Sequence, residues 1–354
     1  MTHRPALGID PVANHRILQN LLDTRPPGKL ELPPGRHVLA DGLRVPGGWT
    51  LAGWTLTGAS ATGTGSGAPA AGTGRGVPAT GTWLVAQGRT GHPVLHVLGS
   101  DVSISDLGLR PAPSDPGEHG GDRGTGLTIG EYLYRSEPEW IQGVDVRRVH
   151  VDHGDLRTAN GIGVMGAVRD VALHDVTVTG GYTGLAVHWG ATGADVASIT
   201  GPTFHPNRLT VSGLRVRNAV EGFYLSSVHD VRVTGARLHD VEMGFRLLPG
   251  DNTDRFVSSP SSSSDVGARI AISDVCVRWS GPLYAVRLAG WGRSEVDGLV
   301  SVLTYRDVTV RDCHLIGIGT GDAWSPVTIE RATGVELSGI HVATTPSDDC
   351  CPLA

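Results

Sequence analysis

The chain has 354 residues, with 35 acidic and 29 basic side chains and a formal net charge of −6 at pH 7. This balance excludes a protein that binds nucleic acid through a large basic surface, and no apolar run is long enough to span a membrane. Glycine is abundant, at 51 residues, which suits a chain with many tight bends. We therefore expect no nucleic-acid and no membrane partner.

The first predicted element is a helix over residues 10–24. Asp10 suits the N-cap and Pro11 the first helical position. A single apolar stripe follows, and Pro26 and Pro27 end the helix. The stripe consists of Val12, Ile17, Leu18, Leu21 and Leu22.

The N-terminal residues contain no apolar core of a secretory signal, so the sequence predicts a cytoplasmic protein.

A nine-residue pattern is then repeated along the chain. It consists of one leading residue followed by the eight positions V-x-[VIL]-x-[DG]-x-x-[VIL]. Each copy predicts two very short strands, apolar at alternate positions and bent by a small or polar pair. Such a strand pair cannot bury its apolar face alone, whereas stacked copies can. The copies lie at residues 48–56, 101–109, 143–151, 170–178, 208–216, 230–238, 269–277, 307–315 and 334–342.

A second pattern, G-L-x-V, lies between these copies and supplies a third strand. Three strands and three bends form one coil of a parallel β-helix, and the shortest interval, from 208 to 230, is about one bare coil. The sequence therefore predicts one all-β solenoid domain over 1–354, of about ten coils, with the N-terminal helix capping its open end. The second pattern occurs at 126–129, 161–164, 184–187, 222–225, 244–247 and 285–288, and loosely at 93–97 and 326–329.

Residues 30–53, LELPPGRHVLADGLRVPGGWTLAG, resemble the start of the pectate-lyase-like superfamily of right-handed parallel β-helices. The resemblance concerns the architecture and extends over nearly the whole chain. It implies a right-handed coil, with an active site on the outside of one sheet, between inserted loops.

Several segments interrupt the coils. Residues 58–81 and 257–265 are rich in small polar residues, and we expect flexible loops there. Larger inserts lie at 131–142, 188–207, 248–268 and 289–304. All four follow the G-L-x-V strand, so they are predicted to leave the same edge of one sheet and to line a groove.

Strand alternation places the candidate catalytic residues on the outer face of that sheet. Most x positions of successive coils are small, His96 being an exception, whereas three consecutive coils carry Tyr224, Arg246 and Arg287. His188 takes the next outward position of its strand. Since coils stack about 4.8 Å apart, these four side chains are expected within about 15 Å. The alternative to a catalytic role is that these outward positions carry polar and charged side chains only because they face water.

The types of these four residues predict acid–base chemistry. Arginines bind carboxylates through a bidentate fork, and a nearby Tyr or His can transfer a proton. Two acidic bends, at 152–155 and 239–242, are weaker candidates because Asp and Gly are ordinary bend residues. The neighbouring inserts supply the predicted substrate-binding residues Trp189, His205, Asp251, Trp291 and Arg293.

The sequence predicts no metal site and no cofactor. The outer face has too few acidic residues for the Ca²⁺ site of pectate lyases, and the carboxylate set of polygalacturonases is absent. We therefore expect a metal-independent lyase, isomerase or cyclase, in an intracellular biosynthetic role. The alternative is a uronate-directed polysaccharide lyase or epimerase. A third possibility is a non-catalytic solenoid that binds glycan or protein through Trp189, Trp279, Trp291 and Trp324.

The four cysteines form no C-x-x-C pair, and we expect free thiols. Cys313 takes an inward step of the nine-residue pattern, and Cys276 takes an outward step.

Overall fold

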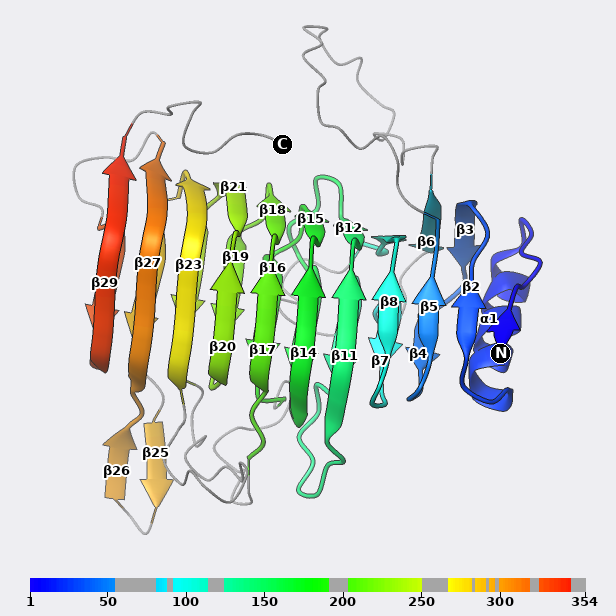
Figure 1. The fold of residues 1–354 in the computed structure, drawn as a ribbon, viewed down its shortest axis with the longest axis horizontal. Helices are drawn as coiled ribbons and strands as arrows, with labels where there is room; N and C mark the ends of the chain where they lie inside the picture. Colours follow the sequence, from blue (N-terminus) through cyan, green and yellow to red (C-terminus); the bar gives the residue numbers. More distant parts are fainter. Residues whose placement is uncertain are drawn as a thin grey trace, which may run out of the picture.

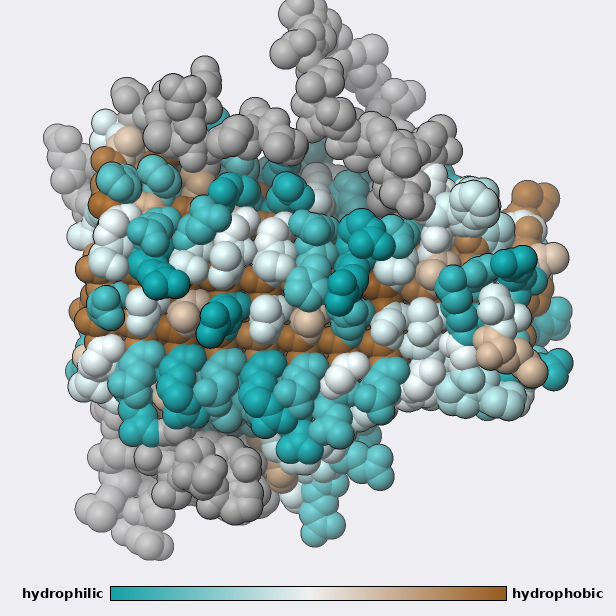
Figure 2. Space-filling model, in the orientation of Figure 1, coloured by the Kyte–Doolittle hydropathy of each residue, from teal (hydrophilic) through white to brown (hydrophobic). Residues whose placement is uncertain are grey.

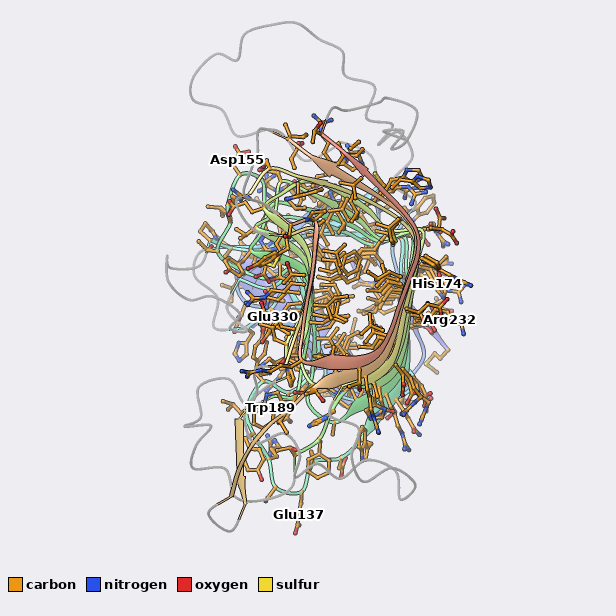
Figure 3. The ribbon with its side chains drawn as sticks, turned by 90° about the vertical axis from the view of Figure 1, so that its left-hand side faces the viewer. Glu137, Asp155, His174, Trp189, Arg232 and Glu330 are labelled. Carbon is orange, nitrogen blue, oxygen red and sulfur yellow. The ribbon has the colours of Figure 1, made fainter. Side chains whose placement is uncertain are left out.

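Parallel strands make up nearly all of the regular structure (Figure 1). The computed structural model describes residues 1–54, 81–87, 92–113, 124–190, 203–249, 267–281, 284–290, 293–296, 299–318 and 325–344. The strands wind into a right-handed parallel β-helix, whose walls are seen end-on in Figure 3. The predicted fold class is therefore confirmed. Asp251, Trp291, Trp324 and the expected flexible segments 58–81 and 257–265 lie outside the described residues, apart from Gly81.

One wall is a nine-stranded parallel sheet with one strand from each coil. The G-L-x-V pattern falls on its strands, as predicted. They are β4 (Leu43–Val45), β7 (Leu95–Val97), β10 (Leu127–Gly130), β13 (Ile162–Met165), β16 (Thr183–His188), β19 (Glu221–Leu225), β22 (Met243–Leu247), β24 (Val286–Ala289) and β28 (Val327–Glu330).

The other wall is an 18-stranded sheet that bends around the core, and the nine-residue copies lie in it. An antiparallel hairpin, β25 (Arg293–Val296) and β26 (Leu299–Val302), lies in one insert. The sheet contains β1 (Thr2–His3), β2 (Lys29–Glu31), β3 (Gly35–Leu39), β5 (Thr50–Ala52), β6 (Thr82–Ala86), β8 (Ser103–Ser105), β9 (Leu107–Arg110), β11 (Ile141–Arg147), β12 (His150–Asp152), β14 (Val168–His174), β15 (Thr177–Thr179), β17 (Asn207–Ser212), β18 (Arg215–Arg217), β20 (His229–Thr234), β21 (Arg237–Val241), β23 (Ala268–Trp279), β27 (Tyr305–Gly317) and β29 (Ala332–Ala343).

A left-handed backbone conformation explains the first residue of every nine-residue copy. Each has a φ between 54° and 78°, which Gly and Asp adopt most easily. Arginine occupies this position twice, and each time its guanidinium binds the aspartate one coil earlier. Arg208 lies 2.6 Å from Asp170, and Arg269 lies 2.6 Å from Asp230. The corner residues thus form a polar ladder along the solenoid.

Aliphatic side chains of successive coils stack inside the helix. Leu173 pairs with Val211 and Val211 with Val233, and all three are buried, as predicted. The glycine that opens G-L-x-V also has a packing reason. A Cβ on Gly222 would lie 2.5 Å from Leu238 Cδ1 and 2.7 Å from the carbonyl oxygen of Gly244, so a side chain does not fit there.

The N-terminal helix α1 (Pro11–Thr24) covers the first coils (Figure 1). Its N-cap is the predicted one, because the Asp10 carboxylate accepts hydrogen bonds from the backbone N–H groups of Val12 and Ala13. Leu18 and Leu22 are buried against the solenoid, whereas Val12 is 63% exposed and was wrongly placed in the stripe. Among the described residues, no helix is long and apolar enough to cross a membrane.

The cysteine prediction is correct at one position and wrong at another. Cys313 is a free, buried thiol in the core, as expected. Cys276 is buried and disulfide-bonded rather than free.

The four long inserts leave the solenoid at the same edge of the nine-stranded sheet. They follow the C-terminal ends of β10, β16, β22 and β24. Glu137 and Trp189, from two of these inserts, lie at the same end of the cross-section in Figure 3. Asp155 lies at the opposite end, so the outer face of this sheet runs between two sets of loops.

Candidate active site

The predicted outward row is present on the nine-stranded sheet. Tyr224 lies in register with Ala186 on one side and Arg246 on the other, and Arg246 with Arg287. His188 takes the next outward position on β16, and its ring centroid lies 6.1 Å from that of Tyr224. The predicted register is therefore confirmed, while the catalytic roles remain predictions.

A buried carboxylate fixes the centre of this row. The Arg246 Nη2 atom lies 2.8 Å from Glu221 Oε1 and donates a hydrogen bond to Oε2 at 2.9 Å. The Arg246 guanidinium carbon lies 4.0 Å from the centroid of the Tyr224 ring. Glu221 therefore holds the guanidinium over the face of the Tyr224 ring, in a cation–π contact.

Glu221 is only 1% exposed, and few groups satisfy it. Thr183 Oγ1 donates a hydrogen bond to its Oε2 at 3.2 Å. Burial raises the pKa of the Glu221 carboxyl, and Arg246 opposes this rise. Burial, followed by the charge of Glu221, also raises the pKa of Tyr182 on the adjoining turn. We name the cluster of Glu221, Tyr224, Arg246 and His188 the tyrosine cluster.

His188 is held as a neutral imidazole. Burial first, and then the positive charge of Arg246, lower its pKa to about 4. The backbone N–H of Gly190 donates to Nδ1 at 3.2 Å, so we assign the proton of the neutral ring to Nε2. In this tautomer Nε2 is a hydrogen-bond donor. His188 is therefore better suited to bind a substrate oxygen than to remove a proton.

A buried tyrosine fixes the end of β19 beneath the cluster. Tyr305 Oη donates a hydrogen bond to the carbonyl oxygen of Leu225 at 2.6 Å and accepts one from the N–H of Ser227 at 3.2 Å. Its burial raises the pKa of Tyr305, so the phenol stays protonated. Tyr305 therefore has a structural role next to Tyr224.

Tyr132 covers part of the outer face of the nine-stranded sheet, on the N-terminal side of the tyrosine cluster. Tyr132, from the insert after β10, packs on Met165 and Ala186, and its hydroxyl accepts a hydrogen bond from Asn160. Beside this cover lies a cavity of about 350 Å³, lined by Glu131, Trp140 and Met165 among others. None of the four predicted catalytic residues lines this cavity. The tyrosine cluster begins one coil beyond it, because Met165 pairs with His188.

Of the five predicted substrate-binding residues, the structure describes the side chains of only Trp189 and His205. Trp189 is buried, and its ring stacks on His188 at 6.0 Å. His205 is also buried, in the segment before β17, with Nε2 3.3 Å from Thr203 Oγ1, and its substrate-binding role stays a prediction. Arg293 lies in β25, but its side chain, like all of Asp251 and Trp291, lies outside the described residues.

The two acidic bends have structural partners. His153 is buried, burial lowers its pKa to about 4, and its Nε2 lies 3.2 Å from the Asn160 carbonyl oxygen. Asp152 lies 3.5 Å from Arg110. Glu242 forms an ion pair with Arg157 at 2.8 Å. These contacts fix the turns around the nine-stranded sheet.

Glu221 is the site residue that the sequence reasoning missed. The prediction used the residues after each G-L-x-V glycine, whereas Glu221 precedes Gly222. Its register neighbours are Thr183 and Met243. Comparing the residue before each glycine would have shown one carboxylate in this row.

Of the four tryptophans considered for a glycan-binding strip, the two that the structure describes, Trp189 and Trp279, are buried and do not present an exposed surface. Trp279 is 0% exposed and Trp189 is 3% exposed.

Within the described part of the chain, no group of three or more His, Cys, Asp or Glu side chains is arranged to hold a metal ion.

No protein-family model matches the sequence, and no curated protein matches it. Endo-xylogalacturonan hydrolase from Aspergillus tubingensis is similar in structure, with a TM-score of 0.55 and 14% identity, covering 98% of this chain and 97% of that one. The chain has the pectate-lyase-like β-helix fold. A second similar structure is the active domain of tailspike protein 2 of bacteriophage CBA120, with a TM-score of 0.55 and 8% identity over 92% of this chain. This chain spans 40% of that domain. At these identities the likeness concerns the fold alone.

Proposed function

We propose that the protein is a carbohydrate-active enzyme that removes a proton from a uronate sugar, as a metal-independent lyase or epimerase. The observation that carries this proposal is the stacking of Arg246 on Tyr224, held by the buried Glu221. The contact places a tyrosine hydroxyl, a group that can transfer a proton, in the same row as two arginines that can bind a carboxylate.

Each member of the site has a role in the proposed reaction. The Tyr224 phenolate takes the proton from the carbon adjacent to the carboxylate. Arg287, partly exposed in the same row, binds that carboxylate and stabilises the negative charge that it gains. The His188 Nε2–H donates to a sugar oxygen. In a lyase the electron pair forms a carbon–carbon double bond and the bond to the leaving oxygen breaks. That oxygen takes up the proton that Tyr224 removed, which restores the base.

Hydrolysis fits the described residues less well. Glycoside hydrolases use two carboxyl groups about 5–9.5 Å apart, one acting as an acid. Glu221 and Glu242 are each ion-paired with an arginine, so both carboxylates already have a partner within the protein. The similar hydrolase from Aspergillus tubingensis therefore supports a carbohydrate substrate more than its reaction type.

An intracellular biosynthetic role on a small metabolite remains an alternative proposal, and so does the cytoplasmic location. The disulfide at Cys276 supports an oxidising compartment instead, because disulfides are rare in the cytosol.

The test is a panel of acidic and neutral polysaccharides, with ultraviolet absorbance reporting a conjugated double bond and proton NMR reporting epimerisation. We expect turnover on a uronate polymer only, lowered about 10²–10⁴-fold in Tyr224→Phe. Turnover of neutral polymers alone, or a folded Tyr224→Phe variant with full activity, would contradict the proposal.

A further inference from the structure

A basic strip lies on the 18-stranded sheet, away from the tyrosine cluster. It is formed by outward side chains of three neighbouring strands, β18, β21 and β23. Arg215 pairs with Arg237 in one row, and in the second row Arg217 pairs with His239 and His239 with Arg278. Hydrophilic side chains cover the part of Figure 2 where β18 and β21 lie.

Carboxylates only partly neutralise this strip. Asp274 lies 3.2 Å from Arg237, and Asp240 lies 3.9 Å from Arg278, both as exposed carboxylates. Four arginines thus face two aspartates, and no ion pair of Arg215 or Arg217 with a described carboxylate is present. Burial, and then the charge of Arg217, lower the pKa of His239, so the imidazole stays neutral and the strip keeps an excess of about two positive charges.

Unsatisfied polar atoms mark the second row. Arg217 Nε, His239 Nδ1 and Arg278 Nε are all buried without a hydrogen-bond partner in the described structure. They lie on consecutive strands of one ladder, so they repeat about every 4.8 Å. These atoms are out of reach of a surface ligand, so binding at the strip rests on the partly exposed ends of the Arg217 and Arg278 guanidinium groups.

We propose that the basic strip binds an acidic polysaccharide, as a second binding site on a face other than the active one. Because the positive charges repeat along the solenoid axis, they match an extended polyanion better than a single small anion. Nucleic acid is disfavoured, since the strip has no Phe, Tyr or Trp on which bases could stack and the whole chain carries −6. The choice of a uronate polymer rests on the proposed function, but binding at the strip requires no catalysis.

The test is calorimetric binding of a purified uronate oligosaccharide to the full chain. The variant is Arg217→Gln with Arg278→Gln, and the matched control is Arg232→Gln, an exposed outward arginine on β20 (Figure 3). We expect the double variant to lose one class of binding site, or to bind there about tenfold more weakly. The control and Tyr224→Phe should keep that site.

Several results would overturn the proposal. These are unchanged binding in the folded double variant, an equal loss in Arg232→Gln, or equally tight binding of single-stranded DNA or a neutral oligosaccharide. A sulfated oligosaccharide is included to distinguish sulfate from carboxylate recognition. The two proposals fail separately. If only the reaction proposal is wrong, the uronate polymer is not turned over, but it still binds to the basic strip of the wild type and binds less to the double variant.

Discussion

Acidification is expected to destabilise the fold through His188. The pKa of its imidazole is about 6.5 in an unfolded chain and about 4 in the folded one, because burial and then Arg246 disfavour the cation. A lowered folded pKa means that the stabilising contribution is complete above pH 6.5 and is lost as the pH falls towards 4.

The size of the effect follows from these values. At about pH 5 a ring without solvent access would lose about 2 kcal/mol of unfolding free energy. His188 keeps some exposure, so solvent screening reduces the expected loss to about 1 kcal/mol.

The assay is urea unfolding of the wild type and His188→Gln at about pH 7.5 and about pH 5. Other histidines, such as His153, titrate in both proteins. The loss of unfolding free energy between the two pH values in the wild type, minus the same loss in the variant, therefore isolates His188. We expect the wild type to lose about 1 kcal/mol more than the variant. Equal losses in both proteins would refute the view that the site holds a neutral imidazole.

Three further changes test the fold and the chemistry. Gly222→Ala should cost about 1–3 kcal/mol or more in urea unfolding, because its Cβ has no space beside Leu238; stability equal to the wild type would contradict this packing. Tyr305→Phe should cost about 1–3 kcal/mol, since the Leu225 carbonyl loses its buried donor; an unchanged denaturation midpoint would contradict that role. Activity should survive EDTA, and a loss restored by Ca²⁺ would count against metal-independent catalysis.

The solenoid was predictable because two independent constraints repeat in the sequence. Val and Leu at alternate positions set the face of each strand, and a left-handed corner favours Gly or Asp, which begin seven of the nine copies. The same alternation placed Tyr224, Arg246 and Arg287 correctly in one row. Local periodicity therefore determined both the register and the outward face.

Other features depend on contacts that periodicity does not encode. Glu221 was missed because its importance comes from Arg246 on the next coil and from burial, neither of which the pattern reports. The burial of His205 could not be predicted, because an insert has no repeat to fix the direction of its side chains. Val12 is exposed because Asn14, in its place, turns inward to donate to the Val38 carbonyl oxygen.

Solvent deuterium exchange tests the proposed chemistry most directly. A uronate oligosaccharide is incubated with the enzyme in deuterated water, and NMR follows the proton on the carbon adjacent to the carboxylate. Proton removal by Tyr224 predicts that an epimerase incorporates deuterium there and that a lyase leaves that carbon without its proton, with both changes lost in Tyr224→Phe. Turnover that leaves this proton in place, as in hydrolysis, would contradict the proposed function.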